Sequence, residues 1–120
     1  MNILMVALGG ALGAVCRYGI SRVPFEANFP IATFITNLIG AFVIGFIAGV
    51  SEKNNVSEKM VLFFKTGFCG GFTTFSTFSL EAMTLLNSGK YLTGGAYMAL
   101  SLILCVAGVA FGQQCARRVI

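Results

Sequence analysis

The sequence predicts an all-α membrane protein with four transmembrane helices, and three observations lead to this prediction. Hydrophobic residues make up 57% of the 120 residues, and the mean hydropathy is +0.87. A soluble domain of this size could not bury so much apolar surface, so its solvent should be lipid. The apolar residues form four runs close to the length of about 20 residues that a helix needs to cross a bilayer. Short links between the runs predict a single transmembrane domain over residues 1–120.

The first run covers about residues 3–20 and is interrupted by Arg17. It lacks the basic amino-terminal region of a secretory signal peptide, so we interpret it as a retained helix. The second run covers about residues 30–50 and begins at Pro30, which suits the first turn of a helix because its ring fixes φ.

Two polar residues of the second run, Thr33 and Asn37, are four positions apart and therefore share a helix face. An amide at membrane depth is costly unless it has partners, which makes Asn37 a candidate functional residue. A structural hydrogen bond between helices is the alternative for this side chain.

The third run covers about residues 59–86 and contains the glycine pair Gly70 and Gly71. Glycine favours non-helical backbone, so the helix is predicted to break near this pair. Unwound backbone inside a membrane is tolerated where it is buried in protein or lines a cavity. The carbonyls freed by such a break can coordinate a cation. Close packing of two helices at the glycines is the alternative.

Five hydroxyl side chains follow the glycines within seven residues: Thr73, Thr74, Ser76, Thr77 and Ser79. On a helix that turns about 100° per residue, Thr73, Ser76 and Thr77 share one face, while Phe75 and Phe78 lie roughly opposite. One short helix would then present hydroxyls to one side and aromatic rings to the other. In the alternative, each hydroxyl bonds a carbonyl of its own helix and the rings pack in lipid.

The fourth run covers about residues 91–115, in which Tyr97 and Ser101 are four positions apart. Both could contribute to a polar path, although a tyrosine can also be an interfacial anchor. Spaced glycine pairs in the first, second and fourth runs allow close helix packing, at Gly9/Gly13, Gly45/Gly49 and Gly108/Gly112. Four helices can hardly enclose a polar path alone, so we expect an oligomer, most simply a dimer.

The charged residues favour an anion as the permeant species. Among the four acids only Glu81 lies within a predicted helix, toward its end or a vestibule, and Arg17 can attract negative charge. Hydroxyl and amide groups supply hydrogen-bond donors, and the edges of aromatic rings are electropositive. The Lys and Arg residues show little bias between the two sides, which permits insertion in both orientations. They form no basic stripe, so no nucleic acid is expected as a partner.

Other functional classes receive little support. The chain has no His and no pairing of nucleophile and base, so it is not expected to be an enzyme. The four Cys are interpreted as reduced packing residues. A small multidrug exporter would need a membrane-embedded acid in the first helix, and residues 3–20 contain none. A membrane scaffold that transports nothing remains a second alternative.

The chain resembles the Fluc/CrcB fluoride channel family over essentially its full length. The resemblance is carried by GGALGAVCRY (9–18), TFITNLIGAFVIG (33–45) and GFCGGFTTFSTFSLE (67–81), with a weaker match at YMALS (97–101). It implies an antiparallel, dual-topology homodimer in the lipid bilayer of the inner (plasma) membrane. It also implies passive export of fluoride from the cytoplasm through two pores.

The resemblance further implies roles for individual residues. Asn37 would line the pore and donate to fluoride, and Phe75 and Phe78 would present their ring edges to it. The polar track would comprise Ser76, Thr77 and Ser79, with Thr33, Tyr97 and Ser101 contributing. Arg17 resembles a vestibule arginine, and the backbone carbonyls of Gly70 and Thr73 resemble the ligands of a structural central sodium ion (Na+).

Overall fold

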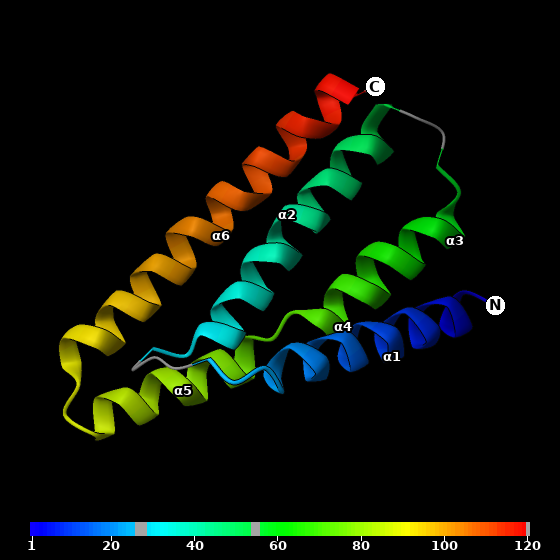
Figure 1. Ribbon diagram of the computed structural model, residues 1–120. Coiled ribbons are helices and arrows are strands. Elements are labelled where there is room, and N and C mark those ends of the chain that lie inside the picture. The colour runs from blue at the N-terminus through cyan, green and yellow to red at the C-terminus, as the bar shows by residue number, and fades with distance from the viewer. Residues whose placement is uncertain (26–28, 54–55, 120) are drawn as a thin grey trace.

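The computed structural model describes residues 1–25, 29–53 and 56–119 and is all-helical over these ranges, which confirms the predicted class (Figure 1). Its helices are α1 (Asn2–Ser21), α2 (Ile31–Lys53), α3 (Glu58–Val61), the π-helix η1 (Leu62–Cys69), α4 (Gly70–Phe72), α5 (Phe75–Asn87) and α6 (Tyr91–Val119). The second and fourth predicted runs extend further than expected, to Lys53 and Val119.

Three of these helices, α1, α2 and α6, are long and apolar enough to cross a membrane. The third predicted span is assembled from the consecutive pieces α3, η1, α4 and α5, with an interruption after Phe72. Both termini lie away from the turn that joins α5 to α6 (Figure 1), as expected for an even number of crossings.

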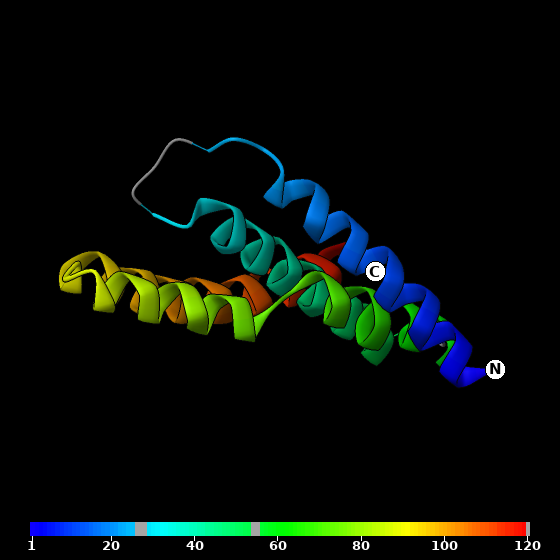
Figure 2. The ribbon, with the colours of Figure 1, turned by 90° about the horizontal axis from the view of Figure 1, so that it is seen from below.

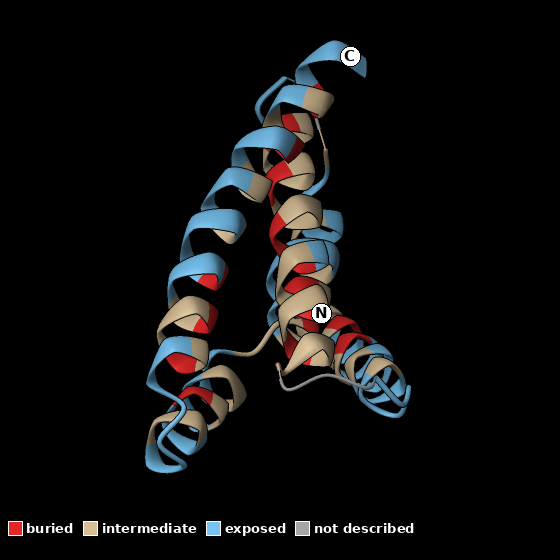
Figure 3. Ribbon diagram, turned by 60° about the vertical axis from the view of Figure 1, so that its left-hand side comes forward, coloured by how far each residue is buried: buried red, intermediate tan, exposed pale blue. Residues whose placement is uncertain are grey.

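The helices pack mainly in two pairs. α2 and α6 lie side by side along their length, and α1 lies against η1 and α4 (Figures 1 and 2). α5 continues beyond the interruption and packs against the first part of α6. Buried positions line the inner faces of the pairs, whereas the outer faces are exposed (Figure 3). This exposed apolar surface is what a lipid-facing protein requires.

The turn between α5 and α6 sets these two helices antiparallel. Gly89 has a φ of 80°, a left-handed conformation that glycine adopts without a steric penalty. The Lys90 N–H donates to the Leu85 carbonyl at 2.9 Å, and the Ser88 N–H donates to the Thr84 carbonyl at 3.0 Å. This helix-ending pattern returns the chain directly into α6.

Glycines allow the close approach within each pair. A Cβ atom on Gly9 or Gly13 would overlap the backbone of η1, and one on Gly45 would overlap the Val109 carbonyl of α6. On the α6 side of the same interface, a Cβ atom on Gly112 would overlap the Phe42 carbonyl of α2. The spaced glycines therefore serve packing between the helices of one chain, as the sequence permits.

We expect Gly45→Val to destabilise the protein by about 1–3 kcal/mol, because the added side chain must separate α2 from α6. The thermal unfolding midpoint of the purified protein in detergent measures this effect. Gly95→Val is the matched control, since a Cβ atom at Gly95 meets nothing within 4 Å. An unchanged midpoint for Gly45→Val would show that the two helices are not packed this closely.

Candidate functional site

The third span is broken at Thr73 and Thr74. Both residues are extended, with φ and ψ of −86° and 159° at Thr73 and −149° and 124° at Thr74. The predicted break is confirmed, but its assignment to the glycine pair is wrong, because α4 includes both glycines and Gly70 has helical angles of −63° and −38°. Gly71 instead permits close packing, since a Cβ atom there would overlap the Gly10 carbonyl of α1.

The two threonines end one helix and begin the next. The Cys69 carbonyl accepts two hydrogen bonds from Thr73, one from its hydroxyl at 2.8 Å and one from its N–H at 3.0 Å. The Thr74 hydroxyl accepts from the Thr77 N–H at 3.1 Å, so Thr74 is the amino-terminal cap of α5. The hydroxyl-bearing helix therefore starts at Phe75, and the prediction that Thr73 shares a helical face with Ser76 and Thr77 is wrong.

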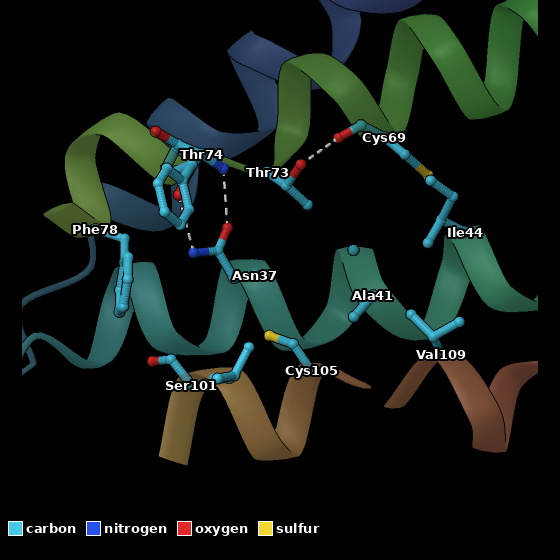
Figure 4. A pocket seen from close by; sticks show the side chains of 13 residues that line it. Asn37, Ala41, Ile44, Cys69, Thr73, Thr74, Phe78, Ser101, Cys105 and Val109 are labelled. Carbon is cyan, nitrogen blue, oxygen red and sulfur yellow. Dashed lines mark hydrogen bonds between the residues drawn. The ribbon is translucent and has the colours of Figure 1, made fainter. Parts of the chain in front are cut away.

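Asn37 of α2 holds the broken backbone from across the bundle (Figure 4). Its Nδ2 donates to the Thr74 carbonyl at 3.0 Å, and its Oδ1 accepts from the Thr74 N–H at 2.8 Å. The amide thus satisfies both main-chain polar groups of the extended residue Thr74, which would otherwise lie unpaired in an apolar surrounding. Its second N–H has no protein partner among the described residues.

This arrangement leaves particular carbonyls without their helical partners. In a continuous α-helix, the Gly70 carbonyl would accept from the Thr74 N–H and the Thr73 carbonyl from the Thr77 N–H. Instead, the Thr74 N–H donates to the Asn37 side chain, and the Thr77 N–H donates to the Thr74 hydroxyl. A third freed carbonyl, that of Gly71, accepts from Arg17 Nε at 3.1 Å. Arg17 therefore contacts the end of α4.

The freed carbonyls are the candidate cation ligands of the chain. Within the described ranges there is no cluster of three or more His, Cys, Asp or Glu side chains that could hold a metal. Carbonyl oxygens suit a hard cation, and the carbonyls of Gly70 and Thr73 have the appropriate chemistry. Two carbonyl oxygens alone do not complete the coordination shell of such a cation.

A carboxylate joins three helices beside the break. The Glu81 side chain of α5 accepts from the Thr33 hydroxyl of α2 at 3.0 Å and from the Tyr97 hydroxyl of α6 at 2.9 Å. Tyr97 is fully buried and Thr33 nearly so. The structure thus brings both predicted residues to Glu81, one to each of its two side-chain oxygens.

A cavity of about 350 Å³ opens beside Asn37 and its two hydrogen bonds to Thr74. It lies between α2, the break, α5 and α6 (Figure 4). Polar and aromatic groups from all four line it, namely Asn37, Thr73, Thr74, Phe75, Phe78 and Ser101, together with Cys69, Cys105 and aliphatic residues. Ser101 is buried, and its hydroxyl has no hydrogen-bond partner in the described parts of the chain. The cavity therefore offers unused hydrogen-bond donors within an apolar surrounding.

The two phenylalanines occupy different surroundings at this cavity. The Phe78 ring lies 5.0 Å from the Tyr97 ring and 5.7 Å from the Phe75 ring, measured between centroids. Phe75 is 80% exposed, so it lies at the open side of the cavity. Phe78 thus packs against Tyr97 of its own chain, whereas the Phe75 ring is largely uncovered.

Three predicted track residues, Ser76, Thr77 and Ser79, do not line this cavity. Ser76 and Ser79 are exposed, and the Ser79 hydroxyl donates to the Phe75 carbonyl of its own helix at 2.8 Å. The sequence alone did not predict that Thr74 pairs with Asn37 and caps the amino terminus of α5. A threonine immediately before a helical run is the signal that could have revealed it.

Three helices long and apolar enough to span a membrane, together with a broken span beside a donor-lined cavity, are typical of a multi-pass membrane protein. The chain belongs to the CrcB-like protein family, described as Camphor Resistance (CrcB), whose family model matches residues 4–113. This membership confirms the resemblance seen in the sequence.

Relatives of the chain carry a more specific name. The chain is 42% identical to a protein of Ignicoccus hospitalis named fluoride-specific ion channel FluC, over 98% of this chain and 97% of the relative. Proteins with the same name from Azobacteroides pseudotrichonymphae and Shewanella woodyi are 44% and 43% identical, over 92% and 94% of both chains. These relatives are named as channels and not as enzymes, in agreement with the prediction for this chain.

Proposed function

We propose that this protein is a fluoride-selective ion channel that exports fluoride from the cytoplasm across the plasma membrane by passive electrodiffusion. The observation that carries the proposal is the cavity in which the Asn37 amide, the Ser101 hydroxyl and the Phe78 ring converge. The names of the relatives support fluoride as the anion.

The chemistry of the cavity suits a small, strongly hydrated anion. Fluoride can leave water only if donors replace its hydration shell. The spare N–H of Asn37 and the unpaired hydroxyl of Ser101 are such donors, and the electropositive edge of Phe78 adds to them. The nearby carboxylate of Glu81 is bonded on both oxygens, which reduces its repulsion of an anion.

The remaining predicted residues would act at the margins of this path. Thr33 and Tyr97 hold Glu81 and are proposed to exchange these hydrogen bonds with a passing anion. Ser76, Thr77 and Ser79 would join the polar track only on the side that meets a second chain. Arg17 would favour anions at the vestibule through its charge, while its Nε holds Gly71.

We further propose that the working unit is an antiparallel, dual-topology homodimer with two pores. The 80% exposure of Phe75 supports this proposal, because a second chain could bury the ring beside the cavity. Two-fold symmetry would also bring together two Gly70 and two Thr73 carbonyls, giving four oxygens for a structural sodium ion. That ion would hold the two broken helices together without being transported.

A fluoride-electrode assay on purified protein in liposomes tests the proposed function. With a potassium gradient and valinomycin to set the voltage, we expect rapid fluoride efflux and little chloride efflux. Liposomes without protein measure the background leak. Chloride efflux as fast as that of fluoride would contradict selectivity, and no efflux of either anion would favour the scaffold alternative.

We expect Gly70→Val to weaken dimer formation and sodium-dependent activity without unfolding the chain. A Cβ atom at Gly70 meets nothing within 4 Å in one chain, so any effect must arise through a second chain or through the bound cation. Gly19→Val is the matched control, because its Cβ atom is equally free. Chemical cross-linking in liposomes with and without sodium measures the dimer, and an unaltered dimer and activity would contradict the sodium site.

A further inference from the structure

One face of α6 presents a row of three polar side chains. Tyr97, Ser101 and Cys105 are spaced by four residues, so they lie above one another on the helix. The Tyr97 hydroxyl donates a hydrogen bond to Glu81, whereas Ser101 and Cys105 line the cavity beside the break (Figure 4). The row therefore continues past the last hydroxyl to a thiol.

A second observation on the same wall is a buried hydroxyl that is free to bind a ligand. Ser101 is only 6% exposed, and its Oγ has no partner among the described residues, although a buried hydroxyl normally has one. Cys105 lies one turn further along the same wall and is half-buried, so this residue is less enclosed than Ser101.

We propose that Cys105 is a modification site inside the conduction cavity, at which a small thiol-directed mercury compound binds and blocks transport. This proposal rests on the proposed function, since the block requires that the anion passes this wall. Sulfur is a soft ligand that selects soft metals over hard ones, whereas the hydroxyl of Ser101 does not. The same wall thus offers a hydroxyl to an anion and a thiol to mercury.

The other cysteines differ from Cys105 in ways that allow them to serve as controls. Cys69 also lines the cavity, but from the opposite wall, and it is only 2% exposed. Cys16 and Cys115 do not line the cavity and are exposed and half-buried, respectively. Reaction at either of these two should leave the path open.

The reaction with methylmercury chloride is balanced without an oxidant or reductant. The Cys105 S–H bond and the Hg–Cl bond break, an S–Hg bond forms, and the proton and chloride leave together as hydrochloric acid. The methylmercury group then stands beside Ser101 in a cavity of about 350 Å³, and an excess of dithiothreitol removes it by thiol exchange.

The test compares three proteins in liposomes, each treated with methylmercury chloride and then with dithiothreitol. They are the wild type, Cys105→Ser, and a Cys16→Ser/Cys115→Ser double variant. Peptide mass spectrometry locates the adduct independently of any transport. Fluoride efflux is expected to fall by at least about tenfold in the wild type and the double variant and to recover with dithiothreitol. Whatever its starting rate, the efflux of Cys105→Ser should not fall further when methylmercury chloride is added.

The two readouts separate the modification site from the proposed function. An adduct at Cys105 supports an accessible site whether or not the protein transports fluoride. Absence of that adduct overturns the proposal, as does an adduct that leaves efflux unchanged. An equal loss of efflux in Cys105→Ser would also overturn it, because the block would then lie elsewhere.

Discussion

Asn37→Asp is expected to abolish fluoride efflux, because one substitution removes a structural hydrogen bond and adds an unfavourable charge. The amide of Asn37 donates to the Thr74 carbonyl and accepts from the Thr74 N–H. A carboxylate keeps the acceptor but turns a second oxygen toward the carbonyl oxygen. The extended peptide that separates α4 from α5 would then lose half of its support.

The charge has the larger effect. Two unit charges 4 Å apart repel by about 4 kcal/mol at the effective dielectric constant typical of protein sites. At 1.4 kcal/mol per tenfold, this repulsion lowers anion occupancy beside the carboxylate by roughly a thousandfold. Efflux should therefore fall to the background leak.

Asn37→Ala separates the two causes. It removes both hydrogen bonds to Thr74 without adding a charge, and we expect it to lower stability by about 1–3 kcal/mol and to slow efflux less than Asn37→Asp. Efflux from liposomes and the thermal midpoint in detergent are measured for both variants. If Asn37→Asp retained wild-type efflux, the anion path would not pass this amide.

The helical class and the interruption of the third span followed from composition and from local pattern. Runs of about 20 apolar residues identify spans, because the bilayer thickness fixes the length that a helix needs. The glycine pair Gly70 and Gly71 was enough to predict a break in that span, although not its exact position. Both features depend on residues close together in the sequence.

The position of the break depends on contacts distant in the sequence. Asn37 stabilises the extended backbone of Thr74 from 37 residues away, and Arg17 holds the Gly71 carbonyl from 54 residues away. Gly71 has a packing role instead, because its lack of a side chain lets α4 approach Gly10 of α1. Intrinsic glycine preference alone therefore points a few residues too early along the chain.

The role of Glu81 shows a second limit of spacing arguments. Positions four apart correctly placed Thr33 and Asn37 on one face of α2, but spacing does not say what each residue meets. The two side chains go to different partners, since Thr33 meets Glu81 and Asn37 meets Thr74. Only the antiparallel packing of α5 on α6 shows that Tyr97 also reaches Glu81.

Phe78→Ile is expected to lower fluoride efflux by up to about tenfold while the protein remains folded. The Phe78 ring lines the cavity, and its centroid lies 5.0 Å from that of the Tyr97 ring. Tyr97 is one of the two hydrogen-bond donors to Glu81. Isoleucine fills similar space but lacks an electropositive ring edge. Aromatic edge interactions are worth up to about 1.5 kcal/mol, which corresponds to about one factor of ten in rate.

A phenylalanine outside the cavity provides the matched control. Phe64 lies on η1 and is 41% exposed, so Phe64→Ile removes a ring without touching the proposed path. Efflux of both variants is measured in liposomes beside their cross-linked dimer fraction. Because both substitutions remove one ring from a folded chain, a selective loss in Phe78→Ile reports the position of that ring. Equal efflux in the two variants would contradict a role for the Phe78 edge.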